Sequence, residues 1–346
     1  MILQIELDDS VNQLIWNEAR DYLLSKKGVT NDIIEYHLNL YQRVRPHSIN
    51  DVYRRLVSTL TNKQGVPNWI GPIENLEPFF ENYSPKAVLS KYTDWEALID
   101  TIQESEFEPP APIDKTNNRN TWVHFTKGAI DGASLLSRFE TVYEFNEFVN
   151  KYTQNGRHLE LADYLSKKIH WYGFALSCDF LKELGFSNFV KPDTHINDIF
   201  HGLGLSKTDD DRTVFRAAIK YSQSINEIPY RVDKLFWLIG SGDFYLTEHL
   251  RNVKTDKKRF IKSTRAKLSS SGFEVPLIVH EKRKTNKKTV DLVHQQAFRS
   301  LIDLLTELRR QNKISDKEQR AHRKRWNDHE NLRDDIILEL NRLKDS

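Results

Sequence analysis

The carboxylate of Asp193 is the side chain in this sequence with the clearest chemical potential. Pro192 ends any preceding helix and fixes the direction in which the chain enters the next one, so Asp193 takes an N-cap position ahead of Thr-His-Ile-Asn-Asp-Ile-Phe. The positive end of that helix stabilises a negative charge at this place. The simpler interpretation is that Asp193 only caps its helix. The short segment around it does not decide between the two.

A turn and an apolar helix precede this carboxylate. Tyr172 and Gly173 form the expected turn, and a helix follows over residues 174–184 until Gly185 stops it. Its apolar residues recur at steps of three and four, as one buried helix face requires. These residues are Leu176, Phe180, Leu181 and Leu184.

This order of turn, helix, loop and Asp-Thr-His-Ile resembles the helix-hairpin-helix GPD (endonuclease III-like) superfamily of DNA glycosylases. In that family a hairpin ends in glycine and the catalytic aspartate follows about twenty residues later, and here Gly173 and Asp193 stand twenty apart. Residues 231–240 (RVDKLFWLIG) resemble a segment found some forty residues beyond the catalytic aspartate, and Asp233 is forty beyond Asp193. The resemblance covers roughly residues 50–245.

The resemblance implies an all-α, bilobal glycosylase fold with a helical C-terminal extension. A six-helix barrel that includes the hairpin is expected over residues 48–188. Residues 1–47 and 189–250 would form the second lobe, which carries Asp193, and residues 251–346 a basic helical extension. The family's iron-sulfur cluster needs several thiolates, and this chain has a single cysteine, Cys178.

The chemistry implied by the resemblance is hydrolysis of an N-glycosidic bond after the base has been flipped out of the duplex. Asp193 would stabilise positive charge on the sugar and orient or deprotonate water. The hairpin would bind DNA phosphate, and a polar residue at the end of the first barrel helix would enter the duplex, unless that segment is an ordinary helix-ending turn. The expected DNA-binding residues are Asn62, Gln64, Lys167, Lys168, His170, Trp171, Tyr172 and Gly173.

Two residues depart from the family pattern. Trp171 occupies the hairpin's usual first glycine, where a positive φ would strain a tryptophan. Ala175 stands where bifunctional members carry a nucleophilic lysine, so a monofunctional enzyme is expected unless Lys182 or Lys191 substitutes. A small Ala175, with His195, indicates a wide base pocket. We therefore hypothesise a bulky modified base, as in phage DNA, and a role in repair or anti-phage defence.

Charge is distributed unevenly along the chain. Residues 251–325 contain 22 Lys or Arg against 8 Asp or Glu, whereas the remainder has 29 basic and 41 acidic residues. This asymmetry predicts a region that faces a polyanion, although a solvated helical face or a partner-binding surface explains it as well. Five cations of one segment are expected to contact DNA: Lys282, Arg283, Lys284, Lys287 and Lys288.

Composition limits the remaining possibilities. With 38% hydrophobic residues, 18 Phe, 13 Tyr and 7 Trp, the chain can build a real core. One cysteine excludes a disulfide framework, and the twelve histidines never show metal-ligand spacing. Since no signal peptide or long apolar run is present, we expect a cytoplasmic protein without a membrane span. We also expect a monomer that carries neither cofactor nor metal. The rival hypotheses are a non-catalytic DNA-binding protein and an interaction scaffold.

The periodicity of apolar residues predicts the elements that position these groups. Ahead of the barrel, helices are expected over residues 11–25 and 30–42, and a proline-containing loop over 104–120. Beyond Asp193, helices are expected over residues 211–222, 231–240 and 257–268.

Overall fold

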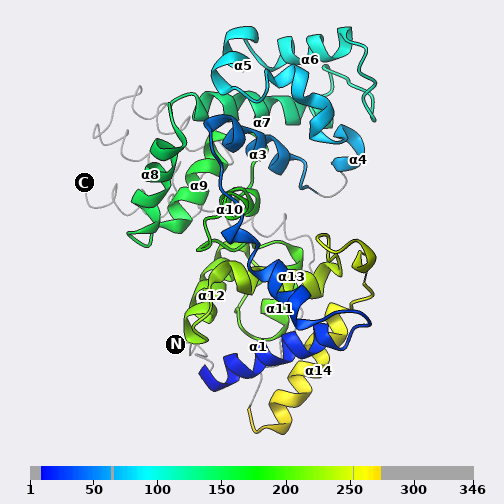
Figure 1. The fold of residues 1–346 in the computed structure, drawn as a ribbon, viewed down its shortest axis with the longest axis vertical. Coiled ribbons are helices and arrows are strands. Elements are labelled where there is room, and N and C mark those ends of the chain that lie inside the picture. Colours follow the sequence, from blue (N-terminus) through cyan, green and yellow to red (C-terminus); the bar gives the residue numbers. More distant parts are fainter. Residues whose placement is uncertain (1–8, 64–65, 252, 274–346) are drawn as a thin grey trace, which may run out of the picture. The chain divides into compact units, whose positions relative to one another are not determined.

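A computed structural model describes residues 9–63, 66–251 and 253–273, and within these ranges the protein contains helices and no β-strand. The predicted all-α class is confirmed (Figure 1). Nine of the fourteen described α-helices begin with a side chain that accepts a hydrogen bond from the first turn, for example Ser48, Asp94 and Asp210. The described helices fall into two groups by their mutual contacts, and both groups belong to the compact unit Met1–Ile278.

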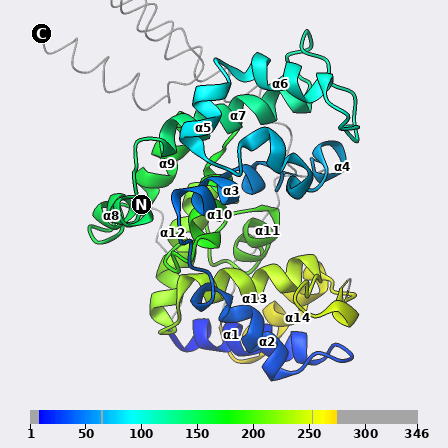
Figure 2. The same ribbon diagram turned by 45° about the horizontal axis from the view of Figure 1, so that its top comes forward.

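The first group surrounds α7 (Thr121–Leu136), which packs against α3, α4, α5, α6 and α9. In Figures 1 and 2, α7 lies between α3 and the pair α5 and α6. Gly132 allows this close approach, because a Cβ there would lie 2.4 Å from Leu56 Cδ2. The other members are α3 (Ile49–Leu60), α4 (Pro67–Ile70), η2 (Ile73–Phe80), α5 (Pro85–Lys91), α6 (Trp95–Glu104), α8 (Val142–Thr153), α9 (His158–Lys168) and α10 (Phe174–Glu183).

The second group surrounds α13 (Pro229–Ser241), which packs against α1, α2, α11, α12 and α14. Its members are α1 (Asp9–Leu24), α2 (Asn31–Leu38), η1 (Leu40–Gln42), α11 (Thr194–Gly202), α12 (Asp211–Ser224), η3 (Glu248–Leu250) and α14 (Lys257–Ser270). Although α14 lies beyond the expected lobe boundary at residue 250, it packs against α1, α11 and α13 and buries Phe260 and Leu268.

The two groups meet where α10 packs against α12. Phe174, the first residue of α10, contacts Phe215 of α12 with ring centroids 5.8 Å apart. Arg212 of α12 pairs with Asp163 of α9 at 2.5 Å. The start of α10, directly after the hairpin turn, is therefore held by both groups.

The single helix expected over residues 30–42 is wrong in one respect. Helix α2 ends at Leu38 and a 3-10 turn, η1, follows. The side chain of Asn39 donates to the carbonyl of Glu35 at 3.0 Å, which competes with continuation of the α-helical backbone bonds. None of the helices in the described ranges has the length and apolar character needed to cross a membrane.

Candidate functional site

Asp193 is half-buried and caps the first turn of α11, as its sequence context predicts. Its Oδ1 accepts hydrogen bonds from the backbone N–H of His195 at 2.8 Å and of Ile196 at 3.1 Å. Its Oδ2 makes no hydrogen bond to any described residue. One carboxylate oxygen therefore fixes the orientation of the group, and the other remains available to a ligand.

A buried ion network, formed by Asp179, Lys182, Lys191 and Asp233, holds the loop that leads to Asp193. The backbone N–H of Lys191 donates to Asp233 Oδ1 at 2.7 Å, and Lys182 Nζ pairs with Asp233 Oδ2 at 2.7 Å. Lys191 Nζ pairs with Asp179 Oδ2 at 2.9 Å. The network thus joins α10, the loop that leads to Asp193, and α13. Sequence reasoning missed it, since only the spacing of Asp233 carried a signal.

Opposite charges outweigh burial at the two lysines of this network, whereas burial raises the pKa of Asp233. Burial by itself lowers the pKa of Lys182, but Asp233 and Asp179 hold that pKa well above its ordinary value. Burial likewise opposes the charge on Lys191, and Asp179 raises its pKa. Both amines therefore carry a proton near neutral pH, and neither matches the neutral amine that a nucleophilic lysine requires.

The two residues expected to enter the duplex are Asn62 and Gln64. Asn62, at the turn after α3, is exposed, and its Nδ2 donates to Asp179 Oδ2 at 2.9 Å. Its side chain is therefore anchored to the ion network. Gln64 lies outside the described residues, as do Lys282, Arg283, Lys284, Lys287 and Lys288.

The turn at residues 170–173, which the sequence predicts as a hairpin, contains a left-handed residue, Trp171, whose φ is 65°. This conformation suits glycine and strains a bulky side chain, so the surrounding contacts must hold it. Gly173 has φ −69° and ψ 172°, which any residue adopts, and a Cβ there would meet no atom within 4 Å. The side chain of Tyr172 is buried, so its expected DNA contact is restricted to the main chain.

Helix α10 begins at this turn without a side-chain cap. Gly173 holds the N-cap position and has no side chain to accept from the first N–H groups. Such a helix start binds phosphate readily, because its N–H groups and the positive end of its dipole point the same way. Lys167 and Lys168 are exposed at the end of α9, six and five residues before Gly173.

The expected base-pocket residues Ala175 and His195 lie on different helices, α10 and α11. Ala175 is half-buried in the first turn of α10. The ring of His195 packs onto α13 at Gly240, where a Cβ would lie 2.6 Å from His195 Nδ1. That Nδ1 is buried without a partner, and burial lowers the pKa of His195, with Asp193 acting in the opposite direction.

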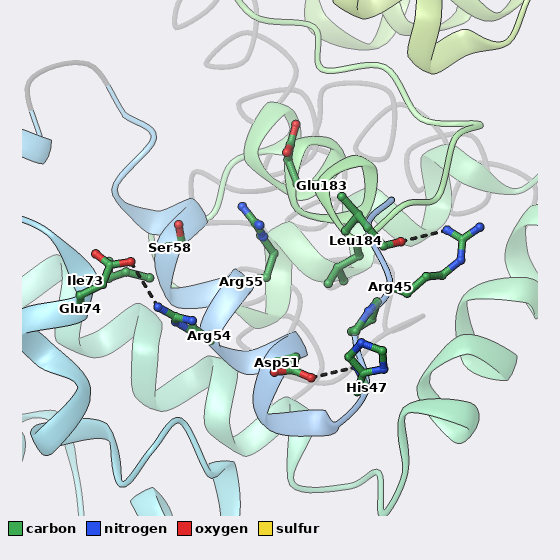
Figure 3. A pocket seen from close by; sticks show the side chains of 12 residues that line it. Arg45, His47, Asp51, Arg54, Arg55, Ser58, Ile73, Glu74, Glu183 and Leu184 are labelled. Carbon is green, nitrogen blue, oxygen red and sulfur yellow. Dashed lines mark hydrogen bonds and ion pairs between the residues drawn. The ribbon is translucent and has the colours of Figure 1, made fainter. Parts of the chain in front are cut away.

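A pocket of about 400 Å³ lies elsewhere, at the start of α3 and the end of α10 (Figure 3). Arg45, Arg55, Glu74 and Glu183 are among its lining residues. Neither Ala175 nor His195 lines it. Likewise, no hydrogen bond, ion pair or ring contact joins Asp193 to residues 170–173 within the described ranges. The expected base pocket around Ala175 and His195 therefore remains a prediction.

Two further observations concern other chemistries. In the described part of the chain, no three His, Cys, Asp or Glu side chains gather as metal ligands. Cys178 is buried in α10, and burial raises the pKa of its thiol, which disfavours a nucleophilic thiolate.

The chain matches no family model, no curated protein and no solved structure.

Proposed function

We propose that the protein is a monofunctional DNA glycosylase that hydrolyses the N-glycosidic bond of a flipped, damaged or modified base. The observation that carries this proposal is the state of Asp193. Two backbone N–H groups hold Oδ1 while Oδ2 has no partner among the described residues. A structural cap needs only the first of these features, and a catalytic carboxylate needs both.

DNA binding is supported by the open start of α10. Its N–H groups lack a side-chain acceptor, and the adjacent Gly173 leaves space for a backbone phosphate. Exposed Lys167 and Lys168 add positive charge nearby in sequence. We expect these groups to bind the strand that carries the flipped nucleotide, since phosphate contacts fix register without reading sequence.

In the proposed reaction, bond cleavage leaves positive charge on the sugar ring. The free Oδ2 of Asp193 would face that charge and orient or deprotonate the attacking water. The ion network would keep this oxygen in place, because Asp233 fixes the backbone two residues before Asp193. The product is an abasic site in an intact strand.

The absence of strand cleavage follows from the lysines. Ala175 occupies the position of the family's nucleophilic lysine. Lys182 and Lys191, the possible substitutes, are both engaged in ion pairs that raise their pKa. A Schiff base with the sugar requires a neutral amine, so none is expected. Trapping with borohydride should leave no covalent protein–DNA complex.

The base is proposed to be bulky, as in modified phage DNA, because Ala175 removes a long side chain from the start of α10. Repair and anti-phage defence both remain compatible with this substrate class. DNAs with bulky-modified, alkylated and deaminated bases should be compared side by side. Strong release of uracil without release of any bulky base would contradict this part of the proposal.

The decisive experiment compares Asp193→Asn with Asp198→Asn. Asn caps a helix as well as Asp does, so both variants should fold. Asp198 lies on the same helix and pairs with Lys257 at 2.6 Å, which makes it a matched control. Alkali-revealed abasic sites should disappear in Asp193→Asn and persist in Asp198→Asn, with DNA affinity unchanged or slightly raised in the former. Full base release by Asp193→Asn would refute the enzymatic proposal and leave a DNA-binding protein.

A further inference from the structure

A cluster of cationic side chains lies beside the turn at residues 170–173, and the sequence did not predict this cluster. It consists of Lys63, His124, Lys127 and His170. These residues come from the turn after α3, from α7 and from the hairpin. His170 is exposed and the other three are half-buried, so the cluster is accessible to a ligand.

The two imidazoles form a pair. His124 Nδ1 and His170 Nε2 lie 2.9 Å apart, and the two ring planes are nearly parallel, at 19°. The ring of His124 also stacks on Trp171 with centroids 5.2 Å apart, and Lys63 Nζ lies 4.2 Å above the Trp171 ring. The strained hairpin residue therefore places the histidine pair and Lys63 together.

Few carboxylates lie near the cluster. Neither Lys63 nor Lys127 forms an ion pair with a carboxylate in the described ranges, and Lys127 Nζ instead lies 4.4 Å above the ring of Trp95. Within the described ranges, the carboxylate that faces the pair is Asp131 of α7, which accepts the backbone N–H of His170 at 2.8 Å. Four groups able to carry positive charge thus face a single carboxylate.

Hydrogen-bond counting shows what a proton would do to the pair. In the neutral pair, one ring donates to the other, which leaves one outward N–H and one outward lone pair. Adding one proton keeps the shared hydrogen bond and turns both outward nitrogens into donors. A phosphate has only acceptors to offer to these groups, so it prefers the singly protonated pair.

We propose that Lys63, His124, Lys127 and His170 bind a backbone phosphate of DNA and take up a proton when they do so. The proposal rests on the DNA binding proposed above and extends it to a second phosphate, on the α7 side of the hairpin. The cluster's lysines supply fixed charge, and the histidine pair supplies charge that appears with the ligand.

The charged surroundings support this coupling. Burial is the largest cause that lowers the pKa of both His124 and His170. Lys63 and Lys127 lower the pKa of both rings further, and Asp131 partly offsets this for His170. Without a ligand the pair therefore remains neutral near pH 7. A phosphate opposes the repulsion from the lysines, raises the pKa of the pair and is bound more tightly as pH falls.

The first test measures affinity for a short DNA duplex between pH 7.5 and 5.5 with the full chain. One linked proton strengthens binding by up to about tenfold per pH unit within the window of titration. We expect the wild type to show this increase and the double variant His124→Gln/His170→Gln to lose it. His249→Gln, at an exposed histidine of η3, is the matched control and should behave as wild type. An unchanged pH dependence in the double variant would overturn the proposal.

The second test follows the imidazole NMR signals of the wild type and so does not depend on any variant folding. Adding the duplex should raise the pKa of the His124 and His170 pair, and adding inorganic phosphate should do so more weakly. A shift with inorganic phosphate and no DNA binding at any pH would refute the proposed DNA binding while supporting a phosphate site. Absence of a shift with both ligands would overturn the site itself.

The third test uses salt. Each phosphate contact contributes about 0.9 to the slope of log affinity against log salt for duplex DNA. Lys63→Gln and Lys127→Gln should each reduce the slope by roughly that amount. Lys151→Gln, at an exposed lysine of α8, should not. Equal slopes in all three variants would count against the lysines as phosphate ligands.

Discussion

The starts of α10 and α11 show two opposite solutions to the same problem. Both helices present unpaired N–H groups and positive dipole ends. At α11 the chain supplies its own anion, Asp193, which accepts from two of these groups. At α10 it supplies Gly173, which accepts from none. The first start has a side-chain acceptor within the protein, whereas the second has none.

The contrast extends to the charges around each start. The loop before α11 is tied down by buried, paired ions, with Lys182 and Lys191 each facing a carboxylate. Beside α10, Lys63 and Lys127 have no carboxylate partner in the described ranges. Paired buried charge fixes a geometry, and unpaired accessible charge attracts a ligand. Lysine therefore fixes the loop in one place, and in the other we propose that it binds a ligand.

The largest effect is expected from breaking the buried pairing. Asp233→Ala removes the closest acceptor of Lys182 Nζ and the acceptor of the Lys191 N–H, and it leaves the buried ammonium with only the longer contacts to Asp179 at 3.4 Å and Glu183 at 3.6 Å. Loss of one partner of a buried ion pair costs about 3 to 5 kcal/mol in free energy of unfolding. Urea denaturation measures it. As a comparison, Glu74→Ala removes the exposed partner of Arg54 and should cost less than about 1 kcal/mol. Equal costs would contradict the positioning role of the network.

The next effect tests the open helix start. Gly173→Asp gives α10 the cap that α11 has, and the extended backbone at Gly173 accepts an L residue without strain. The free energy of unfolding should stay equal or rise by a few tenths of a kcal/mol. DNA affinity should fall at least about tenfold, because the new carboxylate occupies the phosphate position. Gly173→Asn, which caps without charge, should weaken binding less. Unchanged affinity in Gly173→Asp would show that DNA does not use this helix start.

A smaller effect separates the two roles of Asp193 by stability alone. Asp193→Ala removes the cap of α11 and should lower the free energy of unfolding by about 1 kcal/mol. Asp193→Asn retains the cap and should change it by less than about half that amount. Thermal or urea unfolding of both variants measures the difference. If Asn were as destabilising as Ala, the carboxylate charge itself would be needed for the fold.

The last effect appears only on acidification and concerns His37, a buried histidine whose ring nitrogens have no hydrogen-bond partner. Burial, aided by Lys234, lowers the pKa of His37 to about 4. Below pH 6.5 the unfolded chain binds a proton at His37 that the folded chain does not bind, so stability falls as pH falls from about 6.5 to about 4. His37→Phe keeps the ring between Phe244 and Tyr245 and should flatten this part of the pH profile. His249→Gln should leave the profile unchanged.

Local sequence signals predicted the helices well. The expected helix over residues 174–184 is α10, the helix after Asp193 is α11, and residues 231–240 lie within α13. Apolar spacing and capping residues act over one or two turns, so they are legible in the sequence. The left-handed Trp171 follows the same logic, because a turn requires that conformation whichever residue occupies it.

The partners of the site residues could not be predicted in this way. Asn62 and Asp179 are separated by 117 positions and Lys182 and Asp233 by 51, so their contacts depend on how the helices pack. The pairing of His124 with His170 arises from the close approach of α7 to the hairpin. Gly128 permits it, since a Cβ there would lie 2.7 Å from the carbonyl oxygen of His170.

Helix α13 touches the loop of Asp193 at two points. Asp233 holds the backbone just before the carboxylate, and Gly240 receives the ring of His195 just after it. These contacts lie seven positions apart, or about two helical turns, on one rigid rod. A rotation of α13 would therefore also reorient the carboxylate of Asp193. Substitutions where α13 packs against α1 or α2 would thus change the position of Asp193 without contacting it.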